Sequence, residues 1–265
     1  MCAPRWVSVA CMSCYPAWLR PGLDTALPPP TFERESGVYP QSREEVWQRC
    51  LAPGSYAAAF QGRINDAKRR AIQSLNGVQI QRLGLIRITA TDRTPRLLGN
   101  GTHQSFEGML RSAHFGFAPR GDARFSYRFS ELAASAVLPI TFNDWALPFH
   151  QLIDWHAIGI VLNASILDRR VEQAELASVP ARLSTLSLDE VCRRRLALFD
   201  VYHRYLKGPA QWEAAMSEVI RLHRRKQQAK ADLHAQHAAS RAARATITAL
   251  GGAAASGVAA GGAVA

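Results

Sequence analysis

Between residues 56 and 163 the sequence alternates regularly, and this pattern limits the fold more than any other feature. Short apolar runs rich in strand-forming residues alternate with segments that repeat their apolar residues at helical spacing. Repeated strand–helix units favour a parallel sheet that is covered by helices on both faces. We therefore predict an α/β, Rossmann-like fold. The expected strands lie within 56–60, 78–90, 114–118, 137–142 and 157–163, and the helices between them lie within 64–75, 105–113, 126–135 and, as a single turn, 148–155.

Local signals set the ends of several expected helices. In the helix at 64–75, Asn65 is a plausible N-cap and Asn76-Gly77 ends the helical pattern. A longer amphipathic helix is expected at 186–206, and a further helix starts near residue 210 and runs past residue 230.

The length of 265 residues is enough for one large domain with a substantial core. Residues 1–50 are rich in Pro and turn residues, so we expect a disordered leader there. Residues 51–225 form the expected domain. Residues 226–265 read as a helix followed by an Ala/Gly-rich tail, and disorder is the expectation for 249–265.

The net charge of +11 and the pI of about 10.0 describe a surface that attracts polyanions without choosing among them. The excess is local, because residues 193–244 hold twelve Lys or Arg against four Asp or Glu. We interpret this run as a solvated helix face. A basic nucleic-acid binder would rest on charge alone, and since the sequence has no nucleic-acid-binding motif we expect no nucleic-acid partner.

The cysteines do not fix a redox compartment. Cys11 and Cys14 form a C-x-x-C pair, but no second ligand pair follows at the spacing of a zinc site. The sequence has no H-E-x-x-H pattern either, and we predict no metal site. The apolar run near the N-terminus is broken by Pro16 and is shorter than the roughly 20 residues of a membrane span, so it is neither a convincing anchor nor a convincing signal.

Two strand ends carry the residues expected to bind an anion. Gly62 and Arg63 follow the first strand, and Arg120 and Gly121 follow the strand at 114–118. Binding sites in parallel sheets lie at the carboxyl ends of strands, where Gly lets the backbone approach a phosphate and a following helix directs its positive end toward it. Taken alone, the Gly62-Arg63 pair is more typical of an ordinary turn, because many strand ends carry Gly for that reason.

The helix that follows Gly121 adds a cation and a carboxylate on one face. Arg128 and Glu131 are three residues apart, which is the spacing of a common surface salt pair. The functional interpretation is more specific: Arg128 would bind a pyrophosphate and Glu131, about one turn deeper, would accept two ribose hydroxyls. Asp144 follows the next strand in Asn-Asp-Trp and is a weaker candidate near the sugar.

These motifs, in this order and spacing, resemble the exostosin domain of glycosyltransferase family 47. The match extends over about residues 55–206, including "YAAAFQGR" at its start and "LSLDEVCRRRLALFDVYHRYL" at its end. The segments that carry the resemblance are Met109–Ala113, Phe115–Gly121, Ser126–Glu131, Leu138-Pro139-Ile140 and Leu147–Trp155.

The resemblance implies a fold of two facing Rossmann-like lobes, the GT-B arrangement, with this chain similar to the C-terminal, nucleotide-sugar-binding lobe. Family members transfer a sugar from a nucleotide-sugar, usually a UDP-sugar, to a polysaccharide or glycan acceptor with inversion. They are usually Golgi membrane proteins. The implied partners are therefore a UDP-sugar donor and a glycan acceptor, with no tightly bound cofactor; the catalytic base is not assigned.

A second interpretation keeps the donor site but not the activity. The chain would then be a nucleotide-sugar-binding module that lacks the acceptor lobe and partners a membrane-anchored glycosyltransferase. The two interpretations differ in sugar turnover, not in nucleotide binding.

Overall fold

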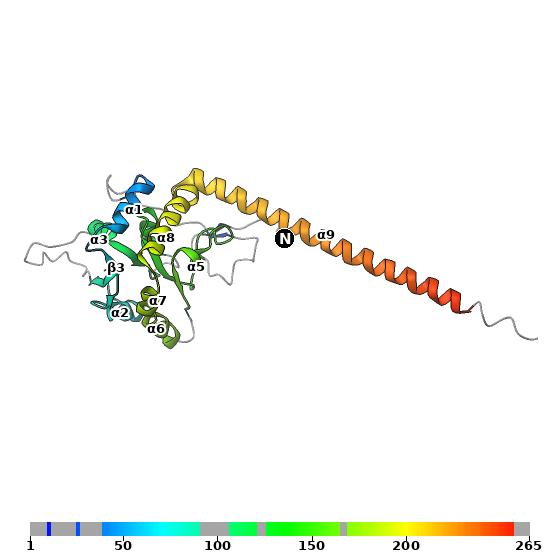
Figure 1. Cartoon of the computed structure of the whole chain (residues 1–265), viewed down its shortest axis with the longest axis horizontal. Coiled ribbons are helices and arrows are strands. Elements are labelled where there is room, and N and C mark those ends of the chain that lie inside the picture. Colours follow the sequence, from blue (N-terminus) through cyan, green and yellow to red (C-terminus); the bar gives the residue numbers. More distant parts are fainter. Residues whose placement is uncertain are drawn as a thin grey trace, which may run out of the picture. The chain divides into compact units, whose positions relative to one another are not determined.

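A computed structural model describes residues 10–11, 25–26, 39–90, 106–120, 126–164 and 169–256. Contacts divide the chain into two compact units, Met1–Val219 and Ile220–Ala265. The first unit holds every strand in the described part of the chain (Figure 1).

A six-stranded sheet forms the centre of the first unit, in the order β4-β5-β3-β6-β7-β8. The β4–β5 pair is antiparallel and the other neighbours are parallel, which confirms the predicted α/β fold. Two very short strands, β1 (Ala10–Cys11) and β2 (Thr25–Ala26), pair with each other in parallel. The strands of the main sheet are β3 (Tyr56–Gly62), β4 (Gln79–Ile80), β5 (Gly84–Ala90), β6 (Ala113–Phe117), β7 (Leu138–Phe142) and β8 (Ile160–Leu162).

The direction of strand addition reverses at β3. The chain passes from β3 to β5 on one side, then returns to place β6 on the other side of β3, and β7 and β8 continue outward from there. Leaving aside the short antiparallel β4, this is the doubly wound order 2-1-3-4-5, in which ligands bind at the carboxyl ends of the two strands beside the reversal. Those two strands are β3 and β6.

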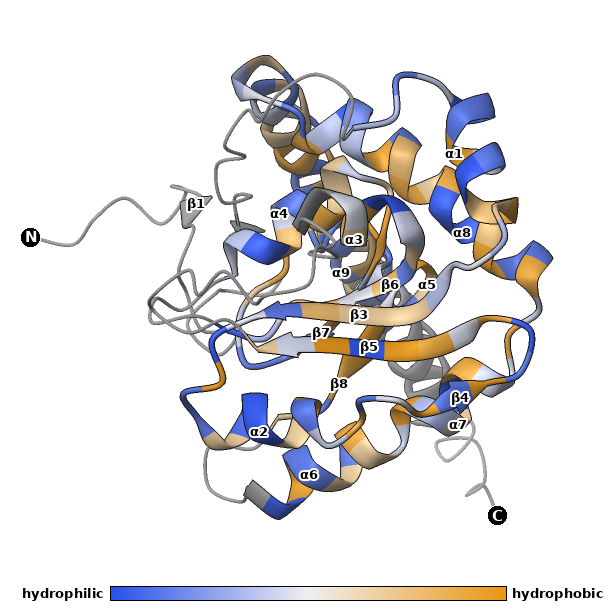
Figure 2. Cartoon of the chain, turned by 90° about the vertical axis from the view of Figure 1, so that its left-hand side faces the viewer, coloured by the Kyte–Doolittle hydropathy of each residue, from blue (hydrophilic) through white to orange (hydrophobic). Residues whose placement is uncertain are grey.

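Helices cover both faces of the sheet (Figure 2). The helices α2, α6 and α7 lie on one side, and α1, α3, α4 and α8 lie on the other (Figures 1 and 2). The helices are α1 (Arg43–Leu51), α2 (Ala67–Gln73), α3 (Phe106–Ser112), α4 (Tyr127–Ala134), α5 (Trp155–Ile158), α6 (Arg169–Ala177), α7 (Val179–Ser184), α8 (Leu188–Val201), the π-helical turn η2 (Tyr202–Leu206) and α9 (Pro209–Ser256).

The packed unit begins before residue 51, where the domain was expected to start. The helix α1 has Ser42 as its N-cap, and Val46 and Cys50 on its inner face are buried. Cys50 forms a disulfide with Cys192 of α8. This helix was not predicted from the sequence because its other positions are largely charged. Its apolar face is only about one residue per turn wide.

Three further local expectations need correction. The N-cap of α2 is Asp66 and not Asn65, because Asp66 has the extended backbone of a cap and its side chain accepts a hydrogen bond from the Arg69 amide. The turn expected at 148–155 is shorter, and α5 starts only at Trp155, behind an Asp154 cap. The helices α6 and α7 were not predicted.

The second unit consists of the remainder of α9. Its side chains between residues 220 and 241 are mostly exposed. Disorder was expected from residue 249, but the helix continues to Ser256. The Ala-rich composition explains this, because Ala has the highest helix propensity and needs no tertiary packing to favour the helix. Residues 257–265 lie outside the described part of the chain. No helix within the described ranges is long and apolar enough to cross a membrane.

Candidate functional site

The first turn of α4 is tied directly to the end of β3. Arg128 donates from Nη1 to Glu131 Oε2 at 2.6 Å and from Nη2 to the carbonyl of Gln61 at 3.1 Å. The Glu131 side chain is 9% exposed and that of Arg128 is 24% exposed, so the pair lies at the edge of the packed interior. The predicted pairing of Arg128 with Glu131 is present, and the Gln61 carbonyl is a partner that sequence reasoning missed.

The position of α4 is fixed by aromatic packing on its inner face. The Phe129 ring meets Trp145 edge-on at 5.2 Å and Trp155 at 4.8 Å between centroids. On the sheet side, a Cβ at Gly116 of β6 would collide with the side chain of Leu132, so only glycine allows this close approach of strand and helix. The guanidinium of Arg128 therefore projects from a helix that has little freedom to shift.

The end of β3 carries the predicted Gly62 and Arg63. A Cβ at Gly62 would lie 2.8 Å from the edge of the Phe60 ring, which makes the strand end tight for any larger residue. The Arg63 side chain is exposed, and its carbonyl accepts a hydrogen bond from Arg69 Nη1 at 3.1 Å. Arg69 is thus a further cation at this strand end, brought there by the first turn of α2.

The end of β6 lies next to that of β3 in the sheet. The strand end is held by hydrogen bonds of Ala118, whose amide donates to the Ile140 carbonyl at 2.8 Å and whose carbonyl accepts from Thr141 Oγ1 at 3.2 Å. Arg120 follows two residues later and is half-buried. Gly121 lies outside the described residues. The topology therefore brings Arg63 and Arg120 to the two strand ends beside the reversal, where Arg128 is bonded to Gln61.

Asp144 is held in an ion pair. Its Oδ2 accepts from Lys68 Nζ at 2.9 Å, and the same ammonium lies 3.2 Å from Glu172 Oε1 and 4.1 Å above the centre of the Phe142 ring. The other oxygen, Oδ1, is buried and has no hydrogen-bond partner among the described residues. The network joins α2 and α6 to the end of β7. Lys68 was not predicted as a site residue, because its partners are distant in sequence.

A separate cavity of about 650 Å³ lies beyond the end of β7. Its lining comes mainly from the segment 143–156, with Val161 of β8. Within that segment Phe149 has a φ of +45°, a left-handed conformation that is strained for an aromatic residue and is held here by complete burial. Apart from this segment's resemblance to a family motif, no pattern in the sequence indicated a cavity. None of the predicted site residues lines this cavity. Its lining includes Trp145, Leu147, His150, Gln151 and Asp154.

Metal binding has no support in the part of the chain that the structure describes. Within it, no cluster of three or more His, Cys, Asp or Glu side chains could hold an ion. The ends of β3 and β6 carry guanidinium groups beside the start of α4, and such groups suit anion recognition.

Comparison with known proteins finds similarity to exostosins over part of the chain. No family model matches the chain. It is 31% identical to the exostosin-1 homolog of Caenorhabditis elegans over 104 residues, which are 39% of this chain and 25% of that protein. It is 27% identical to exostosin-1a of Danio rerio and 26% identical to exostosin-1 of Bos taurus, each over 116 residues, or 43% of this chain and 15% and 14% of those proteins. The chain thus spans a quarter or less of the length of these curated relatives. The matches support a distant relationship of this chain to the exostosins.

Proposed function

We propose that this chain is an exostosin-like glycosyltransferase, or the donor-binding part of one. It would bind the diphosphate of a UDP-sugar at the carboxyl ends of β3 and β6, and the sugar would pass to a glycan acceptor with inversion. The observation that carries the proposal is the position of Arg128, which Glu131 and the Gln61 carbonyl hold at the reversal point of the sheet. The relationship to the exostosins points to the same reaction class and, with it, to the Golgi membrane or lumen.

The proposed work of this site is electrostatic. Negative charge grows on the leaving diphosphate as the bond to the sugar breaks, and fixed cations that face it lower the barrier. Arg120 and Arg128 would contact the diphosphate, with Arg63 beside them. Because Arg128 is already held by two hydrogen bonds, little reorganisation is needed when the anion arrives. Gly62 and Gly121 would let the backbone approach the phosphates.

Glu131 has two roles in this proposal. It orients Arg128 through one carboxylate oxygen, and the carboxylate would also accept hydroxyls of the ribose. Asp144 would lie on the sugar side. Its ion pair with Lys68 fixes the direction of its carboxylate, so Lys68 would act there as a positioning residue.

Calorimetry with UDP tests the proposed diphosphate site. We expect Arg128→Ala to weaken binding at least tenfold, since a hydrogen bond to a charged group contributes about 1.5–3 kcal/mol. The matched control is Arg193→Ala, which removes an arginine that also pairs with carboxylates three and four residues away but lies exposed on α8. Its affinity for UDP should stay within twofold of that of the wild type. Equal losses in the two variants, or no binding of UDP to the wild type, would refute the site.

Testing whether Glu131 binds the ribose requires a second ligand that has no ribose, namely pyrophosphate. Glu131→Ala should weaken the binding of UDP more than the binding of pyrophosphate, because only UDP carries ribose hydroxyls. An equal loss for both ligands would leave Glu131 as a support for Arg128 alone. Release of UDP from a panel of UDP-sugars in the presence of glycan acceptors then distinguishes an active glycosyltransferase from a non-catalytic binding module. Binding without turnover would assign the module that partners a membrane-anchored glycosyltransferase.

A further inference from the structure

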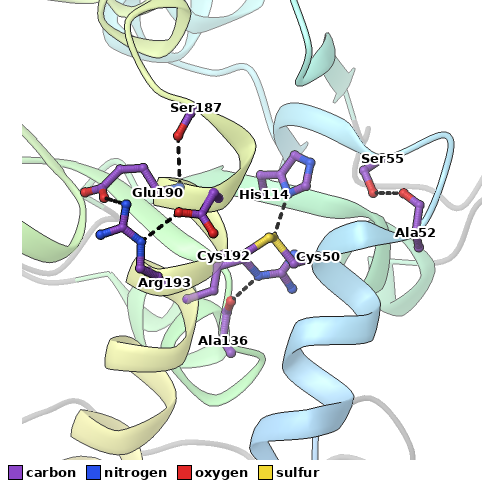
Figure 3. The surroundings of a disulfide bond; sticks show 11 residues. Cys50, Ala52, Ser55, His114, Ala136, Ser187, Glu190, Cys192 and Arg193 are labelled. Carbon is purple, nitrogen blue, oxygen red and sulfur yellow. Dashed lines mark hydrogen bonds and ion pairs between the residues drawn. A yellow bond between two sulfur atoms is a disulfide. The ribbon is translucent and has the colours of Figure 1, made fainter.

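The disulfide between α1 and α8 lies in the interior of the first unit. Cys50 is 1% exposed and Cys192 is fully buried. Figure 3 shows the two sulfur atoms with His114 on one side and the carbonyl of Ala136 on the other. Packing between α1 and α8 surrounds the bond, so its chemistry is set by the few polar groups that share this pocket of the core.

The first of these groups is Arg195, which follows Cys192 by three residues on α8 and so lies on the same face of the helix. Arg195 is fully buried. Its Nε donates to the Ala136 carbonyl at 2.8 Å, but Nη1 and Nη2 have no hydrogen-bond partner within the described residues. Burial above all, and the nearby charge of Arg49, lower the pKa of Arg195 to about 10. At neutral pH the guanidinium is therefore still a cation.

The second group is His114 at the start of β6. Its Nδ1 lies 3.8 Å from the Cys50 sulfur. Burial, and to a lesser extent the charge of Arg195, lower the pKa of this imidazole to about 4. His114 is thus neutral at physiological pH and adds no charge. The disulfide thus shares the core with a neutral imidazole and with a guanidinium that has no anionic partner among the described residues.

An unpaired buried cation is costly, and a disulfide cannot offset that cost because it carries no charge. Reduction changes this balance. A thiolate formed beside a guanidinium is stabilised by it, and this stabilisation is absent from the oxidised form. Whatever favours the reduced form makes a disulfide easier to reduce, as in strongly oxidising thiol–disulfide proteins.

We propose that Cys50–Cys192 is a redox-sensitive link between α1 and α8. Its reduced form stays folded, with Cys50 as a thiol and Cys192 as a thiolate paired to Arg195. A dithiol reductant supplies the electrons. Its thiolate attacks one sulfur, the Cys50–Cys192 bond breaks as a mixed disulfide forms, and the second thiol of the reductant resolves this intermediate into its own cyclic disulfide. Two electrons and two protons leave the reductant; Cys50 keeps one proton as a thiol that faces His114, and the other proton passes to solvent. The proposal does not depend on the proposed function.

The test is the equilibrium between the oxidised and the reduced protein in buffers that contain reduced and oxidised dithiothreitol at fixed ratios. The free thiols are counted after acid quenching and alkylation. We expect Arg195→Met to shift the equilibrium about tenfold toward the disulfide, which equals 29.6 mV for a two-electron couple. Arg195→Lys, which keeps the charge, should retain most of the wild-type value. The neighbouring Arg194→Met is the matched control and should leave the equilibrium unchanged, because Arg194 is already paired with Glu190.

Near-ultraviolet circular dichroism of the reduced wild type supplies the second readout. A folded spectrum together with a shift in Arg195→Met supports the proposal. Equal equilibrium constants in the wild type and in Arg195→Met would overturn it. Loss of the folded spectrum on reduction would overturn it as well, because the bond would then be a purely structural cross-link. If Arg195→Met itself fails to fold, Arg195→Gln replaces it as the neutral variant in the same comparison.

Discussion

His114 of β6 and Arg195 of α8 show how the surroundings of a side chain decide its charge. His114 and Arg195 lie close enough to interact electrostatically, and both are buried. Burial leaves the imidazole neutral because its ordinary pKa is near neutrality. The ordinary pKa of the guanidinium is so far above neutrality that burial does not remove its charge. At neutral pH the same environment therefore holds one neutral and one charged group, and in the folded protein the imidazole takes up its proton only near its pKa of about 4.

The consequence for stability follows from the direction of the His114 shift. Its pKa is about 4 in the folded protein, against 6.5 as the ordinary value. Above pH 6.5 both states carry a neutral imidazole. As the pH falls from 6.5 to 4 the unfolded chain binds the proton first, so the free energy of unfolding decreases, in total by about 3 kcal/mol. We expect His114→Gln to lose less stability than the wild type between pH 7 and pH 4.5. Urea unfolding at both pH values measures this, and parallel losses in the two proteins would contradict the assignment.

At the level of elements, continuous apolar runs were predictable and marginal helices were not. The strands β3, β6 and β7 lie where the sequence placed them, because strands buried on both faces are apolar throughout. The helix α1 was missed because few of its residues face the core. The Arg128–Glu131 pair was predictable from a local spacing, whereas the Gln61 carbonyl lies 67 residues away from Arg128.

Contacts made by tertiary packing explain the other omissions. Lys68 and Asp144 are 76 residues apart, and nothing in either segment identifies the other as its partner. The two cysteines of the disulfide are separated by 142 positions. Five cysteines allow many pairings, and spacing alone does not choose among them. The alternation of strands and helices defines the sheet, but which side chains meet across it depends on the order of the strands.

The start of α2 gives a test at the same level. Asp66 Oδ1 accepts from the Arg69 amide at 2.8 Å, while Asn65 makes only an exposed hydrogen bond with the Arg69 side chain. We expect Asp66→Ala to lower the free energy of unfolding by about 1 kcal/mol, the usual cost of losing an N-cap. Asn65→Ala should change it by less than about 0.5 kcal/mol, as is typical of surface substitutions. Urea unfolding of the two variants decides between them, and a larger loss in Asn65→Ala would return the cap to the position that the sequence predicted.

On the scale of the whole molecule, packing and charge are divided unequally between the two units. The buried residues of α9 include Ala215 and Val219, which belong to the first unit. The second unit, from Ile220, holds seven Lys or Arg against one Asp, and so carries a net +6 of the total of +11. Stability and surface charge can therefore be changed separately by shortening the chain.

A chain that ends at Arg225 should keep the stability of the full-length protein. The core, the disulfide and the Arg128 site all lie within the first unit, which ends at Val219, and the shortened chain keeps residues 220–225 beyond it. We expect a melting temperature within about 2 °C of the full-length value. The deleted side chains as far as residue 241 are exposed except for the half-buried Gln227, and about 1 kcal/mol corresponds to roughly 2–4 °C at this size. The deletion removes Lys226, Lys230, Arg241 and Arg244 with one acid, Asp232, so the chain should elute earlier from a cation exchanger. A melting temperature lowered by more than about 5 °C would mean that residues after 225 stabilise the first unit, and unchanged elution would mean that the charge of this helix does not govern binding to polyanions.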